Sequence, residues 1–119
     1  MQRAAIRPAL AAAMLREGRP VAMPLGGASM RPLFAPGDTV HITPARADDV
    51  RPGDVVVLDL DGQLLLHRLV YKTSDEVVTR GDDSLALDPP RPHDALIGRV
   101  DTAPAPLALY AAIRALFRR

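Results

Sequence analysis

The amino-acid sequence predicts a mainly β protein with a short helix at each end. Short β-branched or alternating runs recur through its middle between Gly-Asp and Pro turns, a pattern typical of a compact sandwich or barrel. The chain contains 12 prolines and only 3% aromatic residues, which is unlike a helical bundle. Its 119 residues, 48% of them hydrophobic, suit one domain with its own core. We therefore expect a single domain over residues 1–119, with the β core at about 21–100.

Helical spacing marks the two ends of the chain. Residues 8–17 start with Pro8, which suits a first turn, and Gly18 follows as a stop. The apolar stripe expected of this helix consists of Ile6, Leu10 and Met14. Residues 107–119 also have an apolar arc, and we expect this second helix to pack on the domain, to lie on an anionic membrane surface or to dock on a partner protein.

Between the helices, the pattern predicts six strands. Pro24 confines the first strand to a sheet edge, because proline donates no backbone hydrogen bond. Val40 and Ile42 share one face of the second strand, and Asp61-Gly62 is a strong hairpin signal between the third and fourth. The predicted strands are residues 21–25, 38–44, 54–60, 63–71, 75–80 and 95–100.

Charge and composition exclude several classes of function. The net charge of +1 is too small to indicate a nucleic-acid partner, although both ends are basic and the middle is acidic. There is no cysteine, so disulfides and thiolate zinc sites are excluded. The three histidines match no metal-binding spacing, and we expect neither metal nor cofactor. Nothing in the sequence specifies an oligomeric state.

No run approaches the ~20 apolar residues that span a bilayer. The apolar stretch near the N-terminus is short and meets Arg16-Glu17, which makes a poor secretory signal. We therefore expect a cytoplasmic protein. The basic ends leave contact with a membrane surface as an open alternative.

Ser29 is the first candidate for chemistry. It follows Gly26, Gly27 and Ala28, and such small neighbours let an extended substrate approach the backbone closely. A nucleophilic serine also needs a base and donors for an oxyanion. A serine after two glycines is more often an ordinary turn residue.

His67 is a candidate base for this serine. It lies in an apolar strand, with Leu65 and Leu69 on its face, so it is either a hydrogen-bonded core residue or a neutral general base. Arg68 points to the opposite face, toward solvent or an ion pair.

Three carboxylates follow in the run from Gly81. Asp82, Asp83 or Asp88 could orient an imidazole as the third member of a Ser-His-Asp set. The same residues are also good turn formers.

Five blocks in order resemble the signal peptidase I and LexA-like serine peptidase superfamily over about residues 21–100. They are "GASMRPLFAPGD", "RPGDVVVL", "LLLHRLV", "TRGDDSLALD" and "LIGRV". The resemblance implies a compact antiparallel coiled-sheet fold. It also implies a serine endopeptidase that cleaves a peptide or protein substrate, with Ser29 as the nucleophile.

His67 occupies the place where bacterial signal peptidases and LexA-like repressors have a lysine base. The His-Arg pair resembles the serine-histidine type of the endoplasmic-reticulum, archaeal and sporulation peptidases, in which an aspartate completes the site. The matching acid is Asp88, with Asp82 as the second candidate. Lys72, the only lysine, lies five residues past His67 and would need a shifted register to serve as the base.

The sequence departs at two points from the peptidases that it resembles. No membrane-spanning segment precedes the serine box, so we expect an unanchored peptidase. Gly27 stands where many relatives have a hydroxyl residue that helps to bind the oxyanion. The residues expected to contact substrate are Met23, Leu25, Gly27, Ala28 and Met30. Two alternatives remain open: a non-catalytic peptide-binding module, and a self-processing or regulatory domain.

Overall fold

The β-branched run after Asp54 forms the centre of a single antiparallel sheet of seven strands. The computed structural model describes residues 7–101. The strand order across the sheet is β1-β2-β7-β3-β4-β5-β6, and every neighbouring pair is antiparallel. The strands are β1 (Val21–Pro24), β2 (Thr39–Pro44), β3 (Val55–Leu60), β4 (Gln63–Lys72), β5 (Glu76–Arg80), β6 (Arg91–Pro92) and β7 (Leu96–Val100).

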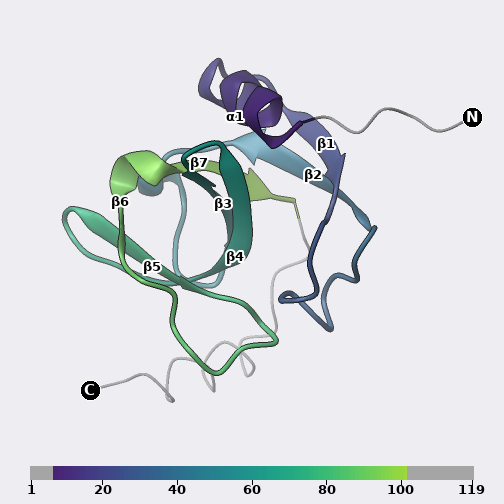
Figure 1. Ribbon diagram of the computed structural model, residues 1–119. Coiled ribbons are helices and arrows are strands. Elements are labelled where there is room, and N and C mark those ends of the chain that lie inside the picture. The colour runs from purple at the N-terminus through teal and green to yellow at the C-terminus, as the bar shows by residue number, and fades with distance from the viewer. Residues whose placement is uncertain (1–6, 102–119) are drawn as a thin grey trace, which may run out of the picture.

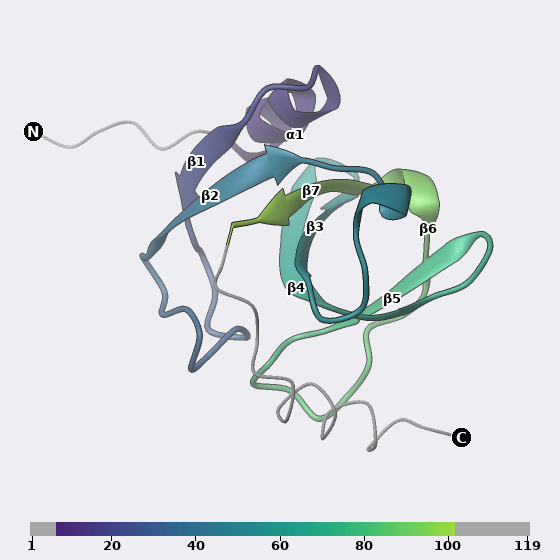
Figure 2. The same cartoon turned by 180° about the vertical axis from the view of Figure 1, so that it is seen from behind.

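The sheet curls strongly (Figures 1 and 2). β1 and β2 lie at one end of the strand order, and β5 and β6 lie at the other. The mainly β, coiled-sheet prediction is therefore confirmed, in the form of one curled sheet and not a two-sheet sandwich. All six predicted strands are present, and β1 with Pro24 is an edge strand. The short β6 strand and the 3₁₀ turns η1 (Ala47–Asp49) and η2 (His93–Ala95) were not predicted.

The hairpin between β3 and β4 sets the position of His67. Asp61 and Gly62 have φ angles of 54° and 89°, the left-handed backbone that a tight two-residue hairpin turn requires. The Gly62 N–H donates to the Asp59 carboxylate at 2.8 Å, which stabilises the turn. From this turn, the pairing runs in register and brings Val56 opposite His67.

Two apolar clusters lie on the two faces of β3. Val55 and Val57 belong to the cluster that includes α1 (Pro8–Arg16), whereas Val56 and Leu58 belong to the cluster that includes η1. A strand buried on both faces needs a continuous apolar run, which explains why the sequence shows no alternation there. β3 is therefore the centre of the core, and β4 beside it carries His67.

The helix α1 has the predicted position but not the predicted buried face. It contacts β1, β2, β4 and β7 through Ala11, Ala12 and Leu15, and Leu10 is 54% exposed. The predicted stripe was wrong because the sheet accepts the side with two alanines, whose small side chains allow close approach. Met14 packs at the margin of the core. Ile6 and the predicted helix 107–119 lie outside the described residues.

Within residues 7–101, no helix has the length and apolar character needed to cross a membrane.

Candidate active site

Ser29 lies exposed in the segment that leaves β1. The next residue, Met30, is fully buried in the core and so attaches this segment to the body of the domain. The Ser29 carbonyl oxygen accepts a 2.8 Å hydrogen bond from the Asp83 N–H, in the loop after β5. Two segments far apart in the sequence therefore hold the serine in place.

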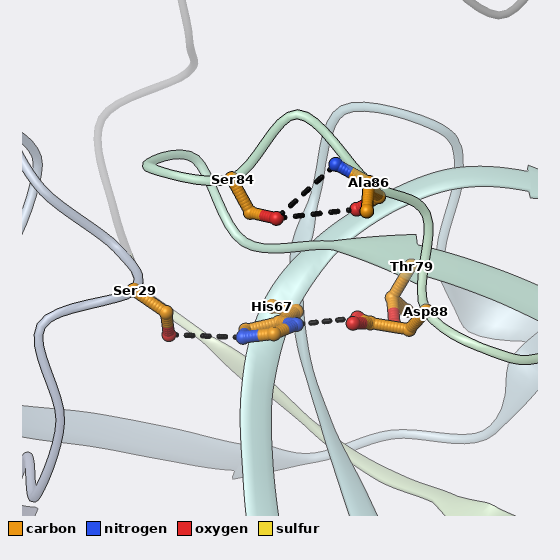
Figure 3. Close-up of polar contacts among 6 residues, drawn as sticks. All are labelled: Ser29, His67, Thr79, Ser84, Ala86 and Asp88. Atoms are coloured by element: carbon orange, nitrogen blue, oxygen red, sulfur yellow. Dashed lines mark hydrogen bonds and ion pairs between the residues drawn. The ribbon is translucent and has the colours of Figure 1, made fainter.

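His67 meets Ser29 across 38 positions of sequence. The distance from Ser29 Oγ to His67 Nε2 is 2.9 Å, within the range of a hydrogen bond (Figure 3). His67 is 8% exposed and lies on the same face of β4 as Leu65 and Leu69. The predicted contact between serine and histidine is present, and the histidine is held by the sheet on an otherwise apolar strand face.

Asp88 contacts the other side of the imidazole. Its Oδ2 atom lies against His67 Nδ1, so the three side chains form a row (Figure 3). An ionised carboxylate can only accept hydrogen bonds, and the proton therefore resides on Nδ1. This tautomer leaves Nε2 as an acceptor for the Ser29 hydroxyl, which is the arrangement a general base requires.

Asp82, the second candidate acid, is engaged elsewhere. Its carboxylate accepts from Arg68 Nε at 3.0 Å and from Arg68 Nη2 at 2.6 Å. Arg68 also donates to the Gly53 carbonyl at 2.8 Å, and both side chains of the ion pair are less than a tenth exposed. Of the two candidate acids, only Asp88 reaches the imidazole, and the ion-pair expectation for Arg68 is correct.

Lys72 is also occupied by structural contacts. Its Nζ donates to the carbonyl oxygens of Ala47 and Val50 at 2.9 Å and 2.7 Å. Because these bonds hold the ammonium at the η1 turn, the lysine does not take the place of His67 beside Ser29.

The predicted substrate contacts divide into two groups. Gly27 and Ala28 are exposed beside Ser29, and Met23 and Leu25 are half-buried against the core. Met30 was wrongly predicted: it is completely buried and is a core residue. Its side chain turns inward because the chain after Ser29 folds back, with the Phe34 N–H bonded to the Met30 carbonyl.

Two residues that sequence reasoning missed touch the row of side chains. Thr79 in β5 donates from Oγ1 to Asp88 Oδ2 at 2.8 Å. Gly81 lies against the serine and histidine, and a β-carbon there would be 3.0 Å from Ser29 Cβ and 3.1 Å from His67 Nε2. The position of Gly81, between a strand and two aspartates, was the one available signal, but it also fits an ordinary turn.

Ser29 is exposed at the surface, outside a hollow that other residues line. A hollow of about 620 Å³ lies elsewhere, between α1, η1 and η2, and residues such as Leu15, Arg46 and His93 line it. None of Ser29, His67 and Asp88 lines this hollow.

The structure thus combines a curled antiparallel sheet with a serine that is hydrogen-bonded to a strand histidine. A family model described as "Peptidase S24-like" matches residues 6–84, about two thirds of the sequence. The chain belongs to this peptidase S24-like family. Neither the search of curated proteins nor that of solved structures found a match.

Proposed function

We propose that this chain is a serine endopeptidase in which Ser29 is the nucleophile and His67 the general base. The observation that carries the proposal is the row from Ser29 Oγ through His67 to Asp88, with 2.9 Å between Oγ and Nε2. Membership of the peptidase S24-like family supports the general class.

The first half-reaction forms an ester between Ser29 and the substrate. As Oγ attacks the scissile carbonyl carbon, its proton moves to His67 Nε2, and the carbonyl oxygen becomes an oxyanion. Collapse of this tetrahedral intermediate breaks the C–N bond, and Nε2 gives the proton to the leaving amine. Asp88 keeps the other ring proton on Nδ1 and stabilises the imidazolium that forms between these events.

Water completes the cycle by the same route. His67 Nε2 takes a proton from the attacking water, and the second intermediate expels Ser29 Oγ, which recovers its proton. The product is a free carboxylic acid, and the enzyme returns to its starting state.

The Ser29 N–H is the oxyanion donor in this mechanism. Among the described residues, no acceptor takes this N–H, so it is available to substrate. Gly27 offers no side-chain donor, which leaves the site with one fewer donor than an oxyanion hole usually has. We therefore expect a slow enzyme.

The substrate in this proposal is a peptide or protein segment in extended form. Within residues 7–101, β1 pairs only with β2, and in this proposal its other edge pairs with an incoming strand. Gly26 and Gly27 have open space where a side chain would project, so a backbone can pass close to Ser29. Met23 and Leu25 would contact apolar side chains of that strand.

A fluorophosphonate probe tests the nucleophile directly. Peptide mapping should locate the label on Ser29, and Ser29→Ala should abolish it. His67→Ala should slow labelling by about 10²–10⁴-fold, the usual contribution of a general base. A folded wild-type protein that takes up no label would overturn the proposal.

The absence of a side-chain hydrogen-bond donor at Gly27 favours a second candidate function, a peptide-binding module without turnover. In that case a peptide library would be retained equally by wild type and Ser29→Ala, with no fragments produced. Intact mass measured over time separates a third outcome, cleavage of the chain by itself.

A further inference from the structure

The Asp88 carboxylate, which contacts His67, also accepts a hydrogen bond from the side chain of Thr79. Its Oγ1 lies 2.8 Å from Asp88 Oδ2, the same oxygen that contacts His67 Nδ1 (Figure 3). Thr79 is 1% exposed, so its hydroxyl is shielded from water. The carboxylate therefore receives two hydrogens at one oxygen, one from the ring and one from the hydroxyl.

We propose that Thr79 is a positioning residue of this site: its hydroxyl fixes the plane of the Asp88 carboxylate and, through it, the orientation of the His67 ring. The inference rests on the proposed function, in which His67 is the base.

Such a bond is needed because the carboxylate of an aspartate rotates easily. Rotation about the last torsion of an aspartate is broad, because it joins sp³ and sp² carbons. The side chain of Asp88 is also about a quarter exposed, so packing alone leaves it room to turn. A second hydrogen bond from a rigid, buried strand restricts that rotation. Thr79 suits the task because its β-branch restricts its own χ1.

The strand register explains why this residue can reach the site. Leu69 of β4 pairs with Thr79 of β5, and His67 lies two residues before Leu69 on the same face. His67 and Thr79 are therefore diagonal neighbours on one face of the sheet, a distance that side chains can bridge. Asp88 enters between them from the loop that follows β5.

The main chain of Asp88 is held by the same residue. Its N–H donates to the Thr79 carbonyl at 2.9 Å. This bond uses no side-chain atom of Thr79, so a substitution that removes only the hydroxyl leaves the loop attached. Thr79→Val makes that change with little alteration in shape, and valine suits a buried strand.

The first test compares rates of fluorophosphonate labelling. Thr79→Val should slow labelling of Ser29 by about 10- to 100-fold, the scale expected for a small misplacement of reacting groups. Thr79→Ser, which keeps the hydroxyl, should restore most of the rate. Thr43→Val is the matched control, because Thr43 also donates to an aspartate, Asp101, but on an exposed surface. We expect this control to label at the wild-type rate.

A double-mutant cycle separates positioning from a general structural effect. In an Asp88→Ala background, Thr79→Val should produce no further loss, because the carboxylate on which it acts is gone. If Thr79→Val slowed labelling equally in both backgrounds, or not at all in the wild type, the proposal would be overturned.

A spectroscopic readout keeps this inference distinct from the proposed function. The proton on His67 Nδ1 can be followed by NMR in ¹⁵N-labelled protein, whether or not the protein reacts with the probe. We expect Thr79→Val to shift this signal and speed its exchange with water, and Thr79→Ser to resemble wild type. An unreactive wild type would refute the endopeptidase proposal alone, whereas an unchanged Nδ1 signal in Thr79→Val would refute the role of Thr79.

Discussion

Gly81 faces Ser29 so closely that a β-carbon on it would lie 2.9 Å from the Ser29 carbonyl oxygen. That distance is shorter than real β-carbon contacts, and the atom it meets is backbone. The same β-carbon would lie 3.1 Å from His67 Nε2. The absence of a side chain at Gly81 is thus a condition for the contact between Ser29 and His67.

Gly81→Ala should therefore separate the serine from the histidine. We expect labelling of Ser29 to slow by about 10²-fold and the free energy of unfolding to fall by about 1–3 kcal/mol, as in other overpacked sites. Gly26→Ala is the matched control for the free energy of unfolding, which should stay near the wild-type value, since a β-carbon there meets no atom within 4 Å. Wild-type labelling by a folded Gly81→Ala variant would show that this close packing does not matter for the site.

Loss of charge should reduce activity at one of the two aspartates after β5 and stability at the other. Asp88→Asn should leave the fold intact and reduce turnover by up to ~10⁴-fold, because an amide can favour the wrong histidine tautomer. Asp82→Asn should lower the free energy of unfolding by about 3 kcal/mol, since it leaves the Arg68 charge buried without its partner. Thermal unfolding and labelling, measured on both variants, test this pair. The reverse pattern would assign the acid to Asp82.

Gly27→Ser should increase activity. Open space surrounds a β-carbon at this position, and the new hydroxyl could supply a second donor to the oxyanion. Loss of one such donor costs other enzymes about 10²–10³-fold, so we expect a gain of at least about tenfold in the acylation rate. Gly27→Ala adds bulk without a donor and controls for it. Equal rates in the two variants would argue against an oxyanion site beside Gly27.

Lys72→Met should affect stability and not labelling. The two hydrogen bonds from Nζ to the Ala47 and Val50 carbonyls would be lost, at a cost of about 1–3 kcal/mol. The folded fraction should still label at the wild-type rate, because His67 and not the lysine lies beside Ser29. Labelling that disappears in folded Lys72→Met would instead identify the lysine as the base.

Much of the sheet could be predicted because its signals are local. Asp61-Gly62 marks a hairpin by its backbone conformation, and Pro24 marks an edge by its missing donor. The buried face of α1 could not be predicted in this way, since it depends on which side chains the sheet can accept. Leu10 is the more hydrophobic residue, yet the small Ala11 and Ala12 are the ones buried.

The site could be predicted only in part, because some of its contacts depend on how distant segments pack together. Ser29, His67 and Asp88 stand out by residue type, and the structure brings them together. Thr79 looks like any strand threonine, and its contact depends on the pairing of β4 with β5. Met30 looked like a neighbour of the substrate because it follows the serine, but the chain folds back and buries it.

Adjacent residues of β4 serve opposite faces of the sheet, with His67 directed to Ser29 and Arg68 to Asp82. Because side chains alternate along a strand, a shift of one residue would move each of them to the opposite face. A deletion of a single residue between Gln63 and Leu66, if absorbed by sliding β4, would put the permanently charged guanidinium of Arg68 beside the serine and the apolar side chain of Leu69 against the buried Asp82 carboxylate. Changes to this strand that keep the site are thus limited to substitutions, and grafting the site onto another sheet would require transfer of the whole β3–β4 hairpin in its present register.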